Sequence, residues 1–112
     1  MRMALDPRAF VEPLLSREQA RQALALLPGS GQVLGAVGRL VESKGFEMLI
    51  EAFAKAVIRK PDLQLAIIGE GPLHAVLQAR IDELGLAGRV HLCGHREDLQ
   101  QLYRAFDWLL VP

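Results

Sequence analysis

Two basic residues lie between glycines in the segment GRLVESKGF, residues 38–46. The segment follows an apolar run and precedes a stretch of helical periodicity, so it is expected to connect a strand to a helix. Arg39 supplies a planar fork of N–H donors and Lys44 supplies a point charge, and both suit phosphate oxygens. Gly45 lies at the expected start of the helix, where free N–H groups and the helix dipole also favour an anion. The segment therefore predicts a local anion site, and the alternative is a simple glycine turn with solvated surface charges.

A second turn, IGEGPL (residues 68–73), places Gly69 and Gly71 on either side of Glu70. It differs from the dinucleotide-binding fingerprint, which requires G-x-G-x-x-G after the first strand and an acidic residue about 20 positions later. The chain also has no G-x-x-x-x-G-K-[ST] segment, so a phosphate-binding P-loop is excluded. Taken by itself, this second turn favours close packing of the backbone over contact with a ligand.

A third segment, LCGHRED (residues 92–98), ends another apolar run with Cys93, Gly94 and His95. His95 could hydrogen-bond a ligand, although a lone histidine in a polar loop is usually structural or exposed. Cys93, the only cysteine of the chain, is expected to be a small core residue and not a reactive thiol. We find no arrangement typical of a catalytic triad, a carboxylate pair or a zinc site, and no candidate general base. Three successive turns with glycine and polar residues make a shared ligand-binding edge more plausible than any one motif.

The balance of charges argues against an extended surface for nucleic acid or anionic membrane. Lys+Arg and Asp+Glu number 13 each in 112 residues, which gives a formal net charge of zero, whereas such surfaces need clustered positive charge. No apolar stretch approaches the roughly 20 residues that span a bilayer. Asp6 and Pro7 interrupt the region where a secretory signal would have its apolar stretch. We therefore expect a cytoplasmic protein that binds no nucleic acid.

Four apolar runs alternate with segments of helical periodicity, which is typical of a βαβαβαβ core. Near-continuous apolar runs predict buried parallel strands at residues 33–38, 63–69, 90–94 and 108–112. Helices are expected at about 46–60, 72–84 and 97–106, and a separate helix at about 16–27 belongs to a lead-in segment, residues 1–32. The pattern predicts one α/β domain with a Rossmann-like parallel sheet of about four strands and helices on both faces. Ligands of such sheets bind beyond the carboxyl ends of the strands, where the three turns would lie.

The last apolar run ends at Pro112 with no helix after it. A sheet that stops on its most apolar strand leaves that strand's edge and part of its faces uncovered, so the sequence is expected to be a fragment of a longer domain. The uncovered edge at residues 108–111 predicts self-association, most simply as a two-fold dimer.

The segments VGRLVESKGFEMLIEAF, LAIIGEGP and VHLCGH…LQQLYRAFDWLLVP resemble the start of the nucleotide-sugar-binding domain of family 4 retaining glycosyltransferases. Their order and spacing are similar to that family over residues 33–112, and ALDPRAF resembles the stretch that leads into the domain. The first segment is specific to that family and GEGP is moderately specific. The third segment matches only loosely, but it lies at the expected distance from the other two. The resemblance implies the GT-B fold, with this chain as the truncated first part of its C-terminal domain.

The resemblance also implies roles for residues of all three turns. In that family an arginine and a lysine hold the donor diphosphate, a glycine turn lies beside the donor, and a third strand end contacts the nucleobase. These roles correspond to Gly38, Arg39, Lys44 and Gly45 for the diphosphate, to Gly69, Glu70 and Gly71 for the donor-site turn, and to Cys93, Gly94 and His95 for the nucleobase region. The arrangement implies no metal and no other cofactor, because two cations and a helix dipole can neutralise the diphosphate.

The implied parent protein is a retaining hexosyltransferase that uses a nucleoside diphosphate sugar and a glycan or cell-envelope acceptor, as in polysaccharide or lipopolysaccharide biosynthesis. The acceptor, and any peripheral membrane, would be bound by a domain that this chain lacks. The family's next motif, with two glutamates for sugar and ribose, would follow Pro112, so the chain alone is expected to be inactive. The rival interpretation is a non-catalytic α/β module, complete at this length, that binds a nucleotide or a protein.

Overall fold

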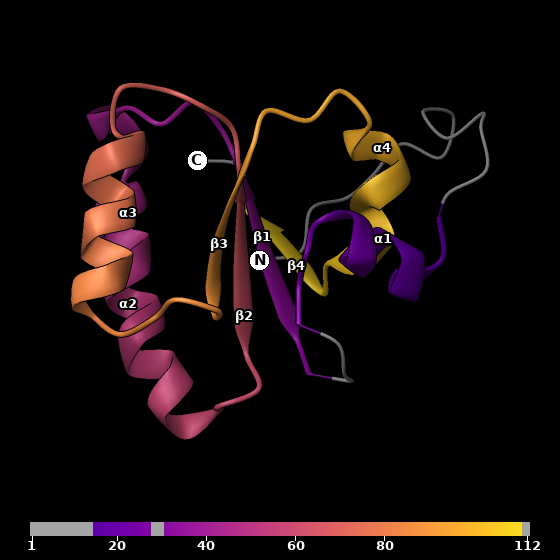
Figure 1. Ribbon diagram of the computed structural model, residues 1–112, viewed down its shortest axis with the longest axis horizontal. Coiled ribbons are helices and arrows are strands. Elements are labelled where there is room, and N and C mark those ends of the chain that lie inside the picture. The colour runs from indigo at the N-terminus through magenta and orange to yellow at the C-terminus, as the bar shows by residue number, and fades with distance from the viewer. Residues whose placement is uncertain (1–14, 28–30, 111–112) are drawn as a thin grey trace.

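The computed structural model describes residues 15–27 and 31–110 of the chain. Four strands form one parallel sheet in the order β3-β2-β1-β4 (Figure 1): β1 (Val33–Val37), β2 (Gln64–Ile68), β3 (Val90–Gly94) and β4 (Trp108–Leu110). The helices are α1 (Arg17–Ala23), α2 (Phe46–Arg59), α3 (His74–Glu83) and α4 (Leu99–Leu102), with 3₁₀ turns η2 (Glu42–Lys44) and η3 (Tyr103–Ala105). The predicted Rossmann-like α/β class is confirmed, and the strand order agrees with the first four strands of a doubly wound sheet.

The two inner strands explain the apolar runs of the sequence. Every residue of β2 is buried, and β1 pairs with it over its whole length, from Val33 opposite Gln64 to Val37 opposite Ile68. Because both faces of these strands are covered, they contain few polar residues. The expected strands are confirmed to within one residue at each end, while residues 111 and 112 lie outside the described part of the chain.

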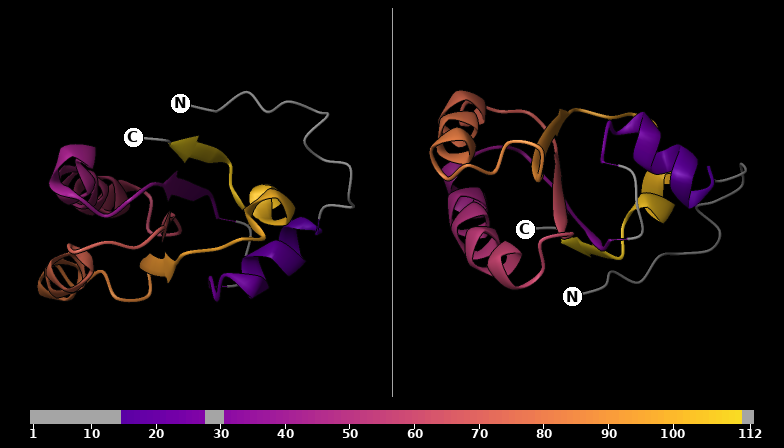
Figure 2. Two further views of the ribbon diagram at one scale, coloured as in Figure 1. Left: turned by 90° about the horizontal axis from the view of Figure 1, so that it is seen from above. Right: turned by 60° about the horizontal axis from the view of Figure 1, so that its bottom comes forward.

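Helices cover both faces of the sheet, as expected (Figure 1). The face under α2 and α3 is filled by large side chains, among them Phe46, Ile50, Phe53, Leu77 and Ile81. The opposite face lies under α1, α4 and η3, which Figure 2 shows side by side, and it is filled by Ala20, Leu24, Leu102, Ala105 and Phe106. The predicted lead-in helix is therefore part of the packed domain.

Helix α1 is shorter than the expected 16–27. Ser16 begins it through a reciprocal capping box, in which its hydroxyl accepts from the Gln19 N–H and the Gln19 side chain accepts from the Ser16 N–H. The helix ends at Ala23, and Ala25 then adopts a left-handed conformation at φ 57°. The chain up to Leu27 is thus a turn that returns to the sheet, and the expected Pro28-Gly29 stop lies outside the described residues.

Two other helices begin later than the sequence predicts. The expected helix at 97–106 is one turn, α4, followed by η3, and Asp98 precedes it with its carboxylate paired to Arg96. Helix α3 begins at His74 instead of Pro72, since Leu73 N–H donates to the Leu40 carbonyl oxygen of the first loop at 3.1 Å. Val76, expected on the buried face of that helix, is 50% exposed.

Strand β4 lies at one side of the sheet. It pairs with β1 from Leu34 opposite Trp108 to Ala36 opposite Leu110, and no strand lies on its other side within residues 15–27 and 31–110. Self-association at residues 108–111 stays a prediction. Sedimentation at micromolar concentration would test it: we expect a dimer that Leu110→Lys dissociates, and a monomer unchanged by that substitution would contradict it.

Candidate functional site

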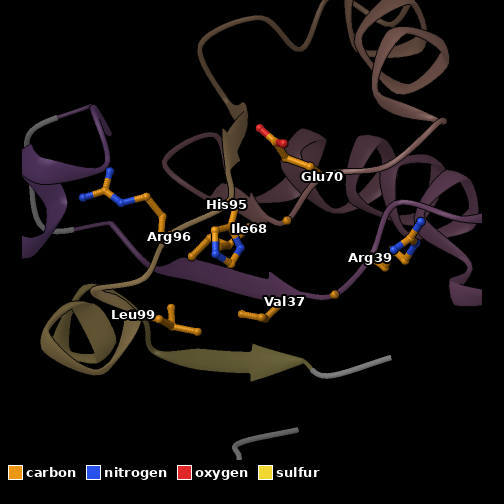
Figure 3. A pocket seen from close by; sticks show the side chains of 9 residues that line it. Val37, Arg39, Ile68, Glu70, His95, Arg96 and Leu99 are labelled. Atoms are coloured by element: carbon orange, nitrogen blue, oxygen red, sulfur yellow. The ribbon is translucent and has the colours of Figure 1, made fainter.

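A cavity of about 510 Å³ opens where β1, β2 and β3 end (Figure 3). Its floor is apolar, formed by Val37 and Ile68 at two strand ends and by Leu99 of α4. The three loops predicted to meet at this edge all contribute to its walls, through Gly38, Arg39, Gly69, Glu70, His95 and Arg96. The structure therefore brings together one part of each of the three predicted turns.

Backbone hydrogen bonds hold the three loops against one another. Gly38 N–H donates to the Ile68 carbonyl oxygen at 3.0 Å, and Leu40 N–H donates to that of Glu70 at 3.1 Å. Gly69 N–H in turn donates to the Gly94 carbonyl oxygen at 2.8 Å, which links the second loop to the third. The loops thus continue the hydrogen bonding of the sheet beyond the strand ends.

Close backbone approach explains the glycines of the second loop. A Cβ atom on Gly69 would lie 1.9 Å from the Gly38 carbonyl oxygen, and Gly69 has φ 146°, which other residues rarely adopt. A Cβ atom on Gly71 would lie 2.6 Å from the Leu40 carbonyl oxygen. The packing turn that the sequence favoured is therefore present, and it leaves the intervening Glu70 exposed at the cavity.

The first loop carries Arg39 into the cavity wall and Lys44 to the start of α2. Arg39 follows β1 and is exposed, while Lys44 ends η2. Gly45 is left-handed at φ 71° and joins η2 to α2, so the 14-residue helix begins two residues after Lys44. Lys44 and Gly45 lie outside the cavity lining, so the predicted anion site divides into a wall residue and a helix entrance.

The third loop leaves the sheet through an irregularity in strand β3. Ile67 pairs with Leu92 and Ile68 pairs with Gly94, so Cys93 is an extra residue between them. Burial raises the pKa of the Cys93 thiol to about 11, which outweighs the opposing charge of Arg96. A thiol with that pKa is protonated at neutral pH, and it packs beside the core under α1 and α4, as expected for a structural cysteine.

Gly94 and His95 complete this loop. Gly94 has φ 72°, which turns the chain out of the strand, and a Cβ atom there would be 3.5 Å from Glu70 Oε1. His95 follows it, exposed, and lies with Val37, Ile68 and Leu99 in the middle of the cavity view of Figure 3.

Half of the predicted site residues line the cavity and half lie outside its lining. The lining includes Gly38, Arg39, Gly69, Glu70 and His95, whereas Lys44, Gly45, Gly71, Cys93 and Gly94 lie outside it. Four lining residues were not predicted as site residues from the sequence, namely Val37, Ile68, Arg96 and Leu99. The apolar three were assigned to strands and core, and Arg96 gave a signal that was overlooked: it is a second basic residue directly after a predicted strand end.

The wall chemistry suits binding better than covalent catalysis. The polar side chains around the cavity are two guanidinium groups, one carboxylate and one imidazole, from Arg39, Arg96, Glu70 and His95. No group of three or more His, Cys, Asp or Glu that could hold a metal ion occurs among residues 15–27 and 31–110. In that same part of the chain, none of the helices has the length and apolar character needed to cross a bilayer.

Comparison with known proteins identifies the family. The sequence model described as Glycosyl transferases group 1 matches residues 31–112, which include every strand of the sheet. The chain belongs to the group 1 glycosyl transferases. Among relatives, it is 30% identical over 97% of its length to 2-deoxystreptamine glucosyltransferase of Streptomyces kanamyceticus, and 34% identical over 95% to mannosylfructose-phosphate synthase of Agrobacterium fabrum. It spans only 29% and 25% of the lengths of these two relatives.

Solved structures show the same fold, among them one of a group 1 family protein. The C-terminal domain of LpcC from Francisella tularensis superposes with a TM-score of 0.75 at 27% identity, covering 95% of this chain and 57% of the other. HepE from Anabaena, solved with UDP and glucose, superposes with a TM-score of 0.70 at 27% identity over 94% of this chain and 27% of its own. The sheet and helices described above are thus those of a GT-B C-terminal domain.

Proposed function

We propose that this chain is the first part of the donor-binding domain of a retaining glycosyltransferase. The parent protein would transfer a hexose from a nucleoside diphosphate sugar to a glycan or cell-envelope acceptor. The observation that carries the proposal is the position of Arg39: an exposed guanidinium at the wall of an apolar-floored cavity, beyond the carboxyl ends of the strands, in a group 1 family member. The crystal structure of HepE in complex with UDP and glucose supports a nucleotide sugar as the ligand class.

In the proposed mode of binding, Arg39 contacts the diphosphate by its fork of N–H donors. Lys44 adds a positive charge at the entrance of α2, whose first N–H groups and dipole also favour an anion. The nucleoside would lie over Val37, Ile68 and Leu99, near His95. Charge that develops on the diphosphate as the sugar departs would be stabilised by about 2–4 kcal/mol for each such donor, without a metal ion.

We assign acceptor binding, the sugar contacts and any membrane association to parts of the parent protein outside this chain. The parent protein would act in the cytoplasm. We therefore expect this polypeptide alone to hydrolyse or transfer donor no faster than buffer. Turnover that Arg39→Ala abolishes would contradict that expectation. The rival interpretation, a non-catalytic module that binds a nucleotide or a protein and is complete at this length, would be excluded by continuation of the reading frame past Pro112 into a glycine-rich segment with glutamates.

Titration of the 112-residue chain with UDP, GDP and ADP, followed by amide chemical shifts, tests the binding proposal. We expect shifts in the loops at residues 38–45, 69–71 and 93–96, and a loss of affinity of about tenfold or more in Arg39→Gln, as for removal of a hydrogen bond to a charged group. Arg59→Gln is the matched control, because Arg59 is an exposed arginine in the last turn of α2, far along the helix from Gly45. Shifts confined to other regions, or equal losses in the two variants, would overturn the assignment.

A further inference from the structure

Arg96 is a basic residue of the cavity wall whose three nitrogens all donate to protein acceptors. Nε and Nη2 donate to the two carboxylate oxygens of Asp98, each at 2.9 Å. Nη1 donates to the backbone carbonyl oxygen of Ala23 at 3.1 Å. Arg39, in contrast, has no side-chain hydrogen bond or ion pair to any described residue. Two guanidinium groups of one cavity thus differ in kind, since one is available to an anion and the other is committed to the fold.

The bond to Ala23 joins the cavity to the lead-in helix. Ala23 is the last residue of α1, and it lies 73 positions before Arg96 in the sequence. The final carbonyl groups of a helix lack partners within it, so an arginine side chain is a favourable donor there. Figure 3 shows the Arg96 side chain extending from the third loop toward α1, whereas His95 lies among the other lining side chains.

Besides these bonds, the start of the same loop is held by the hydrogen bond from the Gly69 N–H to the Gly94 carbonyl oxygen. Gly94, immediately before, has φ 72°, and Cys93 is an extra residue in the pairing of β3 with β2. Asp98, immediately after Glu97, precedes the single turn of α4 and has its pKa lowered chiefly by the hydrogen bonds from Arg96. Arg96 therefore fixes the path of the chain between an irregular strand end and a short helix, which is the stretch that carries His95.

We propose that Arg96 is a positioning residue for the nucleoside side of the donor site. By tying the third loop to Asp98 and to the end of α1, it holds His95 and the loop backbone at the cavity wall without contacting the ligand itself. This inference rests on the proposed function, because it takes the cavity to be the donor site. It makes α1 part of the binding machinery: a displacement of the lead-in helix would be transmitted to the cavity through one side chain.

Comparing the affinities of two ligands distinguishes this positioning role from direct contact between Arg96 and the ligand. Isothermal titration of the 112-residue chain would compare inorganic pyrophosphate with the nucleoside diphosphate, UDP or GDP, that binds the unaltered chain more tightly. For Arg96→Met we expect nucleoside diphosphate affinity to fall about three- to tenfold, the scale of a hydrogen bond, and pyrophosphate affinity to stay unchanged. Asp98→Asn should also weaken nucleotide binding, since it removes the negative charge and one of the two oxygens that accept from the guanidinium.

Arg80→Met is the matched control. Arg80 is likewise a doubly paired arginine, bonded to Glu51 and Glu83, but it lies on α3 at the other face of the sheet, so both affinities should be unchanged. Ligand-free amide spectra supply a second readout: Arg96→Met should shift the amides of His95 and of the end of α1 together. Arg96→Lys, which retains the charge but lacks the planar fork, should resemble Arg96→Met.

Several results would overturn the inference. Loss of pyrophosphate affinity in Arg96→Met, with an unchanged urea midpoint, would make Arg96 a direct phosphate ligand. Tighter nucleotide binding in Asp98→Asn would also indicate direct contact, by a guanidinium released from its pair. Unaltered nucleotide affinity in Arg96→Met contradicts the positioning role alone, whereas failure of the unaltered chain to bind either ligand contradicts the proposed function itself.

Discussion

At the amino ends of the strands, polar side chains bond to one another and to the backbone, whereas at the carboxyl ends the backbone makes the bonds and several polar side chains are exposed. The first region centres on Asp107, which accepts from Arg17 at 2.8 Å, from Arg21 at 3.3 Å and from the Val33 N–H at 2.7 Å. Arg21, only 5% exposed, also donates to the Ala105 carbonyl oxygen. These charged side chains at this end of the sheet are thus paired with one another or bonded to the backbone.

A buried amide side chain, that of Gln64, also bonds to the backbone at the amino end of the sheet. Gln64, 3% exposed, accepts from the Leu27 N–H at 2.9 Å and donates to the Leu27 carbonyl oxygen at 3.2 Å. His91 Nε2 lies 3.0 Å from the same Gln64 oxygen, so that nitrogen carries the hydrogen. Burial, and then the charge of Arg89, lowers the pKa of His91, which is therefore neutral at pH 7.

The carboxyl end has the opposite character. Arg39, Glu70 and His95 are exposed around the cavity, and their side chains have no hydrogen bond or ion pair to residues 15–27 or 31–110. The loops that carry them are held by N–H donation from Gly38, Leu40 and Gly69. Except for Arg96, whose side chain holds the third loop, stability and binding are thus separated on the molecule. Side chains stabilise the amino end, whereas the backbone stabilises the carboxyl end and leaves Arg39, Glu70 and His95 for a ligand.

The largest effect expected from this comparison is on Asp107. Asp107→Asn keeps the shape of the side chain but removes the negative charge beside Arg21, so we expect the free energy of unfolding to fall by about 3 kcal/mol, as when a buried pair is broken. Urea unfolding would measure it. Asp62→Asn is the control, because Asp62 is an exposed aspartate; equal losses in the two variants would show that the amino end is not held by its charges.

Glycine substitutions test the carboxyl end, where the backbone is expected to matter most. Gly69→Ala would force a Cβ atom against the Gly38 carbonyl oxygen, 1.9 Å away, at a φ of 146°. Gly45→Ala has φ 71° but nothing within 4 Å of the added atom. We expect Gly69→Ala to lower the free energy of unfolding by about 2 kcal/mol more than Gly45→Ala, since it adds steric overlap to backbone strain. Similar urea midpoints would contradict the close packing of the first two loops.

The sequence predicted the carboxyl end better than the amino end for a physical reason. Strands were visible as apolar runs, and the cavity loops as glycine and polar residues directly after them, both of which are local patterns. Asp107, by contrast, bonds to Arg17 and Arg21, which precede it by 90 and 86 positions in the sequence. Nothing in the sequence near either arginine indicates that one of them is buried. The role of Arg96 was missed likewise, because its second acceptor is a backbone carbonyl oxygen 73 positions away.

Acid should weaken the amino end selectively. Although burial raises the pKa of Asp107, hydrogen bonds from Arg17 and the Val33 N–H, with the charges of both arginines, lower it below its ordinary value of 3.8. Its contribution to stability is therefore fully present above about pH 5 and is lost as pH falls through the lowered pKa. We expect the difference in unfolding free energy between the unaltered chain and Asp107→Asn to be constant from about pH 7 to pH 5 and to shrink below about pH 4. A difference that stays constant to pH 3 would contradict a charged role.

The smallest effect belongs to the exposed side chains of the cavity. Arg39→Gln and His95→Gln remove polar groups that make no hydrogen bond within the described chain, so each should change the free energy of unfolding by less than about 0.5 kcal/mol. Arg39→Gln should nevertheless lose most of the affinity for a nucleoside diphosphate. Urea unfolding and nucleotide titration of the same samples would test the two expectations together. A loss of stability as large as that of Asp107→Asn would mean that Arg39 serves the fold, and the separation between a side-chain-stabilised end and a ligand-binding end would then be wrong.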